Sequence, residues 1–274
     1  MGPLQAIALG IVQGLTEFLP ISSSGHLVLL QNLFGINEPE LLFDICLHLG
    51  TLIAVCAVFI REIHLVLAAI WRLPEMLKSS GGFFPLYREN EELRLAVLIV
   101  TGTIPTGILG VFFQKIADQL FGSVLLVGFM LLVTGGVLWL TRRVPVQMRP
   151  LKEMTAKDAL TIGLVQGLAV MPGISRSGST ISAALFLGIN REVAGRFSFL
   201  LSIPAILGAL VVGFESDAIQ SGMSGVQILL GTASAAGVGF VALKVLLRLV
   251  NQGRLHFFAP YCWLAGMAAI ITAW

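Results

Sequence analysis

Six stretches of the sequence are apolar over about the 20 residues that a helix needs to cross the hydrocarbon core of a membrane. They cover residues 40–60, 93–113, 123–141, 197–214, 226–247 and 257–274. Only 12% of the residues are charged, against about 25% in soluble domains. The sequence therefore predicts an all-α polytopic membrane protein, formed as one integral membrane domain over residues 1–274. Its net charge of only +2 argues against a nucleic-acid partner.

Two further apolar regions, residues 4–35 and 158–190, are each interrupted near the middle by proline, glycine and serine. The fragments on either side of each break are too short to cross a membrane. Irregular backbone at membrane depth is tolerated only where it lines a cavity or is buried in protein. We therefore expect two re-entrant helix–loop–helix hairpins beside the six transmembrane helices.

The two breaks share a sequence. Residues 10–25 read GIVQGLTEFLPISSSG, and residues 163–178 read GLVQGLAVMPGISRSG. Nine of these sixteen positions are identical at a constant offset of 153. Because three full spans separate the copies, they would enter the membrane from opposite faces. The sequence thus predicts two inverted repeats, about 1–141 and 155–274, joined by a cytoplasmic loop 142–157, with the broken helices meeting near the midplane.

Charge predicts the orientation. Of the 17 lysine and arginine residues, 15 lie in the loops 61–94, 142–157, 191–196 and 244–256. Positive loops favour the cytoplasmic side, which puts the N-terminus outside. Segment 62–78 is too charged to span and is expected to form an amphipathic helix on the cytoplasmic surface.

The reactive side chains are divided between the two breaks. Glu17 and His26 occur only in the first copy, and Arg176 occurs only in the second. A charge at membrane depth is costly and usually functional, and the planar guanidinium matches a phosphate. The competing interpretation is that Arg176 only pairs with Glu17 and fastens the hairpins together.

The first break offers a nucleophile. Ser23 and His26 are three residues apart and would share a helical face, so the imidazole could take the proton of the hydroxyl. Glu17 could orient His26, act as an acid or base, or bind a divalent cation. Asp44 and His48, inside the span 40–60, either contact this site or form hydrogen bonds within the bundle, and we favour the second.

The second break offers groups that bind anions. Its glycines allow backbone N–H groups to approach a phosphate, and its hydroxyls could donate to one or could cap helices. The predicted phosphate-binding residues of the two breaks are Ser22, Gly173, Ser175, Arg176, Ser177, Gly178 and Thr180.

Three segments carry a resemblance to a known family: Gln13 to His26, Pro172 to Thr180, and FSFLLSIPA at 197–205. The chain resembles the undecaprenyl-pyrophosphate phosphatases of the bacitracin-resistance type, integral membrane enzymes. The resemblance implies removal of the terminal phosphate of a C55 polyprenyl diphosphate, which recycles the lipid carrier of cell-wall synthesis. It also implies a bacterial inner-membrane location with the active site opening to the periplasmic side.

The resemblance also implies roles for residues. Glu17, His26 and Arg176 would be essential, and Ser23 would be the nucleophile or would position the attacked phosphorus. The family depends on Mg²⁺ or Ca²⁺, for which Glu17 and Gln13 are the expected ligands. The expected partners are the polyprenyl diphosphate and membrane lipids, with a homodimer as the alternative to a monomer.

A transport function is the alternative. Inverted repeats with broken helices are typical of secondary transporters. A polyprenyl-phosphate flippase would need the same anion site but no nucleophile.

Overall fold

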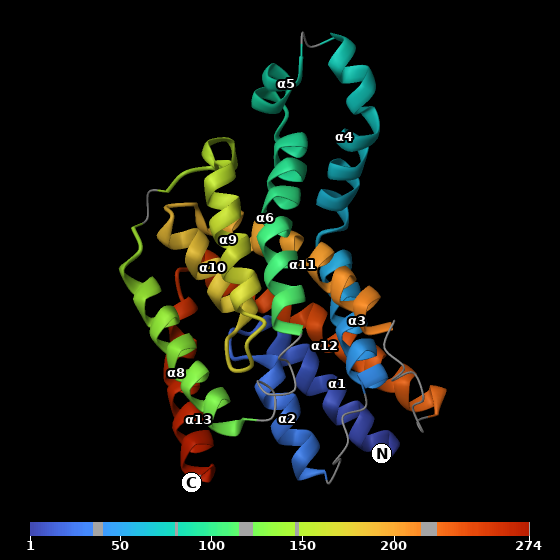
Figure 1. Ribbon diagram of the computed structural model, residues 1–274, viewed down its shortest axis with the longest axis vertical. Helices are drawn as coiled ribbons and strands as arrows, with labels where there is room; N and C mark the ends of the chain where they lie inside the picture. Colours follow the sequence, from blue (N-terminus) through green and yellow to red (C-terminus); the bar gives the residue numbers. More distant parts are fainter. Residues whose placement is uncertain (35–40, 80–81, 115–122, 146–147, 215–223, 274) are drawn as a thin grey trace.

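The computed structural model describes residues 1–34, 41–79, 82–114, 123–145, 148–214 and 224–273 (Figure 1). Within these ranges the regular secondary structure is helical, and no strand occurs beyond one isolated bridge between Arg149 and Ile189. Both termini lie at one end of the molecule, and α5 lies toward the other (Figure 1). The prediction of an all-α polytopic membrane protein is confirmed.

Among the described residues, five helices are long and apolar enough to cross a membrane. They are α6 (Glu91–Gln114), α8 (Val124–Leu140), α11 (Arg191–Phe214), α12 (Gly225–Asn251) and α13 (Ala259–Thr272), the last together with the short helix η4 (Leu255–Phe258). They correspond to five of the six predicted spans. The sixth prediction falls on α3 (Leu41–Val58), which qualifies only together with α4 (Ile60–Ser79), and the two are bent by 79° at their junction.

The helix predicted at 62–78 forms most of α4, which projects from the body of the molecule beside α6 (Figure 1). One side of α4 is held by a small apolar cluster of Ala69, Leu86 of α5 (Phe83–Glu89) and Leu93 of α6. Trp71, on the same helix, is 86% exposed. The predicted helix is therefore present, and its place on the cytoplasmic surface stays a prediction.

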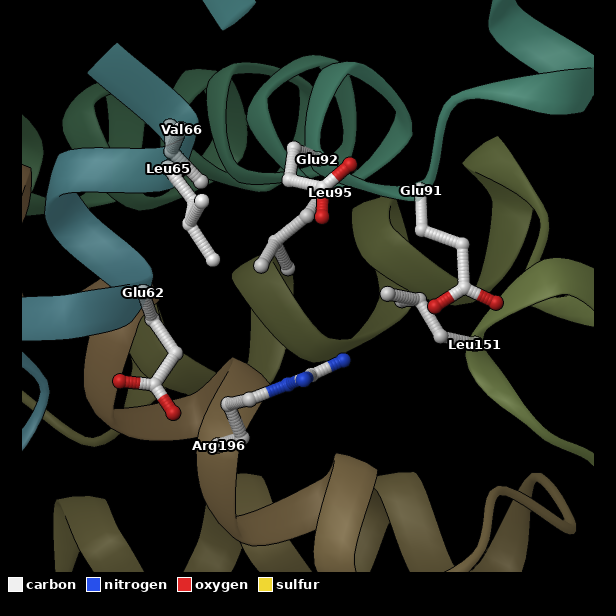
Figure 2. A pocket seen from close by; sticks show the side chains of 8 residues that line it. All are labelled: Glu62, Leu65, Val66, Glu91, Glu92, Leu95, Leu151 and Arg196. Atoms are coloured by element: carbon white, nitrogen blue, oxygen red, sulfur yellow. The ribbon is translucent and has the colours of Figure 1, made fainter. Parts of the chain in front are cut away.

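Charged side chains gather where α4, α6 and α11 meet. Figure 2 shows Arg196 extending into a small cavity that Glu62, Glu91 and Glu92 also line. None of the predicted site residues lines this cavity.

Each broken region forms two short helices. The first consists of α1 (Pro3–Phe18) and α2 (Ser23–Leu33), and the second of α9 (Ala156–Leu168) and α10 (Arg176–Phe186). At 1.5 Å per residue, none of these helices reaches across about 30 Å of hydrocarbon.

Local sequence explains both breaks. Leu19 leaves the helical region, with ψ at 138°, because the residue before a proline is sterically pushed out of it. Ser22 (φ 70°) and Gly173 (φ 91°) take left-handed backbone conformations, which no helix continues.

The first helices of the two regions begin alike. The N–H of Gly2 donates to Oε1 of Gln5 over 2.6 Å, and the N–H of Thr155 donates to Oδ2 of Asp158 over 2.8 Å. Both pairs are separated by the same offset of 153 that relates the two sequence copies. They satisfy backbone donors that a helix leaves open at its start.

Close packing against a transmembrane helix follows the same pattern. A Cβ atom added to Gly10 would overlap the carbonyl oxygen of Gly231 on α12, and one added to Gly163 would overlap that of Gly102 on α6. Gly10 and Gly163 are equivalent positions of the two copies. The two inverted repeats stay a prediction, which these equivalent contacts support.

We expect Gly163→Val to prevent correct assembly of the second hairpin. The backbone of Gly102 cannot move aside as a side chain can, so the overpacking should cost at least about 3 kcal/mol. The yield of monodisperse protein and its melting temperature in detergent measure this. Gly107→Val on α6, where nothing lies within 4 Å of the added atom, is the matched control. A Gly163→Val protein as stable as this control would contradict the expectation.

An ion pair ties the loop 142–157 to the second hairpin. Arg149 donates to both oxygens of Asp158, over 3.1 and 3.2 Å, and to the carbonyl oxygen of Leu187 over 2.6 Å. Burial raises the pKa of Asp158, but the hydrogen bonds from Arg149 and Thr155 outweigh it and leave that pKa below its ordinary value. A depressed pKa means that the pair stabilises the fold at neutral pH and that this stabilisation is lost as the pH falls through the folded-state pKa.

Asp158→Asn should therefore lower the melting temperature at pH 7 by about 2–4 °C, as the loss of a helix cap and an ion pair would. The difference from wild type should shrink when the pH drops below about 4, the ordinary range of aspartate. Thermal unfolding in detergent at the two pH values checks this, with the exposed Glu153→Gln as a control. Equal melting temperatures of Asp158→Asn and wild type at pH 7 would show that the Arg149–Asp158 ion pair does not stabilise the fold.

Candidate active site

The two breaks lie against each other, as predicted. The N–H of Gly173 donates to Oγ of Ser22 over 3.1 Å, and Oγ of Ser177 donates to the carbonyl oxygen of Phe18 over 2.9 Å. All of these groups are buried. The ends of α1 and α10 are thereby fixed to each other.

A transmembrane helix also holds the second break. Oγ1 of Thr134 on α8 donates to the carbonyl oxygen of Gly173 over 2.9 Å and accepts from the N–H of Ser175 over 3.2 Å. Oγ of Ser175 in turn accepts from the N–H of Gly178 over 3.1 Å and so caps α10. Arg176, the first residue of α10, is therefore presented from a rigid turn.

Arg176 and Glu17 meet across the two hairpins. Nη2 of Arg176 donates to Oε1 of Glu17, and the side chains are only 17% and 8% exposed. In the described part of the chain, Nη1 of Arg176 is buried without a hydrogen-bond partner. The pair with Glu17 that the fastening interpretation expects is therefore present, and it leaves one N–H-bearing atom of the guanidinium without a partner among the described residues.

Ser23 bonds to Glu17. Its Oγ donates to Oε2 over 2.6 Å, and Nε2 of Gln13 donates to the same oxygen over 3.2 Å. A carboxylate oxygen at this distance can accept the hydroxyl proton directly. The site therefore joins a hydroxyl, a carboxylate and a guanidinium in one chain of contacts.

The predicted bond between Ser23 and His26 is not formed in the described structure. Nδ1 of His26 lies 2.8 Å from the carbonyl oxygen of Ser22, and its Nε2 lies 2.6 Å from the hydroxyl of Tyr261. The spacing of Ser23 and His26 predicted that they share a helical face. In the structure, however, each side chain contacts a residue of another helix. Ser23 turns toward α1, and His26 turns toward α13.

His48 lies at the site, contrary to our preference for a role within the bundle. Its Nε2 is 4.0 Å from Oε2 of Glu17, and its Nδ1 is 2.8 Å from the carbonyl oxygen of Asp44. Because a carbonyl only accepts, Nδ1 carries a proton, and Nε2 is the ring atom that faces Glu17.

The predicted phosphate-binding hydroxyls are engaged within the protein. Besides the contacts of Ser22, Ser175 and Ser177 described above, Oγ1 of Thr180 donates to the carbonyl oxygen of Arg176 over 2.9 Å. A Cβ added to Gly178 would lie 2.9 Å from Cβ of Pro20, so this glycine provides close packing. In this arrangement these residues build the hairpins, and Arg176 alone of the predicted set has a buried donor without a partner among the described residues.

The expected divalent cation fits the site only together with a substrate. Glu17 is the one carboxylate at the site, Gln13 has a buried Oε1 without a hydrogen-bond partner, and the described residues hold no group of three potential metal ligands among His, Cys, Asp and Glu. Mg²⁺ is commonly bound by one or two carboxylates plus substrate phosphates. Glu17 and Gln13 match such a shared site and do not form a closed cage.

Tyr261 is a site residue that the sequence analysis missed. It lies in an apolar span, and nothing in its spacing relates it to the breaks. The only available signal was its rarity, since the chain contains two tyrosines.

Comparison with known proteins gives concordant matches. Residues 6–268 match the family model described as bacitracin resistance protein BacA. A protein named undecaprenyl-diphosphatase from Desulfatibacillum aliphaticivorans is 51% identical, over 98% of both chains. Proteins of the same name from Desulfosudis oleivorans (50% identical, over 100% of this chain and 98% of the relative) and Methanosphaera stadtmanae (44%, over 98% of both) also match.

Proposed function

Because the chain belongs to the family of bacitracin resistance proteins BacA, we propose that it hydrolyses undecaprenyl diphosphate to undecaprenyl phosphate and inorganic phosphate. This activity would recycle the lipid carrier of peptidoglycan synthesis and confer bacitracin resistance. The names of the relatives support this reaction. The observation that carries the proposal is the contact chain from Ser23 through Glu17 to Arg176, which crosses between the two hairpins.

The first step uses the contacts of Glu17. Nη1 of Arg176 binds the terminal phosphoryl group, and Glu17 accepts the proton of Ser23. Oγ of Ser23 then forms a bond to the terminal phosphorus while the bond to the bridging oxygen breaks, and undecaprenyl phosphate leaves. Charge on the equatorial oxygens is stabilised by the guanidinium.

The second step returns the enzyme to its starting state. Water attacks the phosphorus of the phosphoserine, the bond to Oγ breaks, Glu17 returns its proton to Oγ of Ser23, and inorganic phosphate leaves. His26 accepts the proton of that water and then releases it to solvent. In the alternative route without a covalent intermediate, His26 activates the water that attacks the diphosphate itself, and Ser23 positions the phosphorus.

A divalent cation, Mg²⁺ or Ca²⁺, would be held by Glu17 and Gln13 together with the substrate. When bound it would neutralise part of the diphosphate charge. Glu17 would also keep Arg176 in place, so its carboxylate is central to binding as well as to proton transfer.

The protein would lie in the bacterial inner membrane with the N-terminus and the site opening on the periplasmic side, and substrate would enter from the outer leaflet. The distribution of the basic residues over the predicted loops supports this orientation. The transport alternative has no support from the relatives, which are named for hydrolysis.

Phosphate release by the purified protein in detergent, from a long-chain polyprenyl diphosphate, tests the proposal. The assay is run with and without EDTA and beside Glu17→Gln, which keeps the shape of the side chain but removes its charge. Release that requires both Glu17 and the divalent cation is the expected result. A folded protein that binds the lipid but releases no phosphate would refute the proposed function.

A further inference from the structure

Two adjacent residues of α13 contact the first break. Sγ of Cys262 donates to the carbonyl oxygen of Pro20 over 3.4 Å, and the hydroxyl of Tyr261 lies 2.6 Å from Nε2 of His26. The rings of Tyr261 and His26 are also stacked, with centroids 5.7 Å apart and planes inclined by 15°. The last transmembrane helix therefore touches the catalytic break both at its backbone and at its histidine.

The hydrogen bonds of His26 define which ring nitrogen carries the proton in its neutral form. The carbonyl oxygen of Ser22, 2.8 Å from Nδ1, can only accept, so Nδ1 carries a proton. In the neutral ring Nε2 then has a lone pair, which accepts the proton of the Tyr261 hydroxyl. When Nε2 becomes protonated the bond reverses, because a phenol oxygen also accepts. The contact with Tyr261 can thus persist in both charge states of His26.

Packing does not require the Tyr261 hydroxyl. The buried residues of α13 are Ala259, Cys262, Gly266 and Ala269, which recur every three or four positions and form one face of the helix. Tyr261 stands off that face and is 45% exposed. Its contact with His26 is therefore an addition to the packing of α13.

We propose that Tyr261 is a positioning residue for the phosphatase reaction. It holds the His26 ring by stacking and keeps Nε2 as the proton-accepting atom. The proton of water reaches Nε2 through the Tyr261 hydroxyl, which gives its own proton to the Nε2 lone pair as it takes the proton of water, and Tyr261 then accepts a hydrogen bond from the resulting Nε2–H. This inference rests on the proposed function, and it assigns to α13 a part of the site outside both hairpins.

Tyr261→Phe tests the proposal, because it retains the ring and removes only the hydroxyl. We expect kcat for phosphate release to fall about 10-fold, at the lower end of what the loss of an orienting partner costs. KM should change less than about twofold, since Tyr261 need not contact the phosphates. Tyr87→Phe, the only other tyrosine of the chain, lies on α5 and should behave as wild type.

A double-mutant cycle with His26→Ala separates positioning from general stability. If Tyr261 acts through His26, Tyr261→Phe should cause no further loss of kcat in the His26→Ala protein. An unchanged kcat in the single variant, or an equal loss in both backgrounds, would overturn the inference while leaving the proposed function intact. A wild-type protein that releases no phosphate would overturn both.

Discussion

Arg176→Lys should lower kcat/KM for phosphate release by about 100- to 1,000-fold, the range for removing one donor from a developing oxyanion. Lysine keeps the positive charge, but it cannot perform both proposed functions of the guanidinium, which are to bind Glu17 and to bind the phosphate. Nη2 is bound to Glu17, and Nη1, which is buried without a partner among the described residues, is the donor that we propose for the phosphate. A lysine ammonium is a single point charge and cannot hold Glu17 and a phosphate in the same fixed geometry.

The measurement is steady-state phosphate release, with the melting temperature of each variant as a check on folding. Arg72→Lys is the matched control, because Arg72 is exposed on α4. It should leave the rate unchanged. If Arg176→Lys keeps most of the wild-type rate, Arg176 serves only to fasten the hairpins.

Ser23→Ala should reduce kcat on the order of 1,000-fold or more, because a nucleophile that forms a covalent intermediate has no substitute at the site. Its neighbour Ser24 provides the comparison. Oγ of Ser24 lies 3.4 Å from Oγ of Ser22 and takes no part in the contact chain to Glu17. Ser24→Ala should therefore remain close to wild type.

Acid-quench trapping with substrate labelled in the terminal phosphate tests directly whether Ser23 forms a covalent intermediate. A labelled phosphoserine should form at Ser23 in wild type and be absent from Ser23→Ala. Full activity of Ser23→Ala without any labelled protein would eliminate the covalent route and leave the direct attack of water.

The sequence predicted the two hairpins and the meeting of their breaks. Proline, glycine and serine in apolar sequence are local signals, and the repeated block reports a relation between distant segments. The pairing of Glu17 with Arg176 was also among the expectations, since two opposite charges at membrane depth have few other partners.

The partners of Ser23 and His26 were not predictable in the same way. Spacing indicates which residues share a face of one helix, but which helix lies opposite depends on packing. Tyr261 and His48 come from α13 and α3, which the sequence pattern does not place beside the first break. The internal partners of the hydroxyls of the second break were unpredictable for a related reason. Composition shows that donors are present but does not show that caps and interhairpin bonds already use them.

The division of the reactive groups between the hairpins also constrains the biogenesis of the protein. During synthesis Glu17 and Ser23 leave the ribosome first, Arg176 follows more than 150 residues later, and α13 comes last. A nascent or truncated chain therefore has the hydroxyl of Ser23 and the carboxylate of Glu17 but lacks the guanidinium of Arg176, which completes the contact chain. Under the proposed mechanism, catalytic activity therefore requires that the second hairpin has inserted and docked, so it appears only late in synthesis.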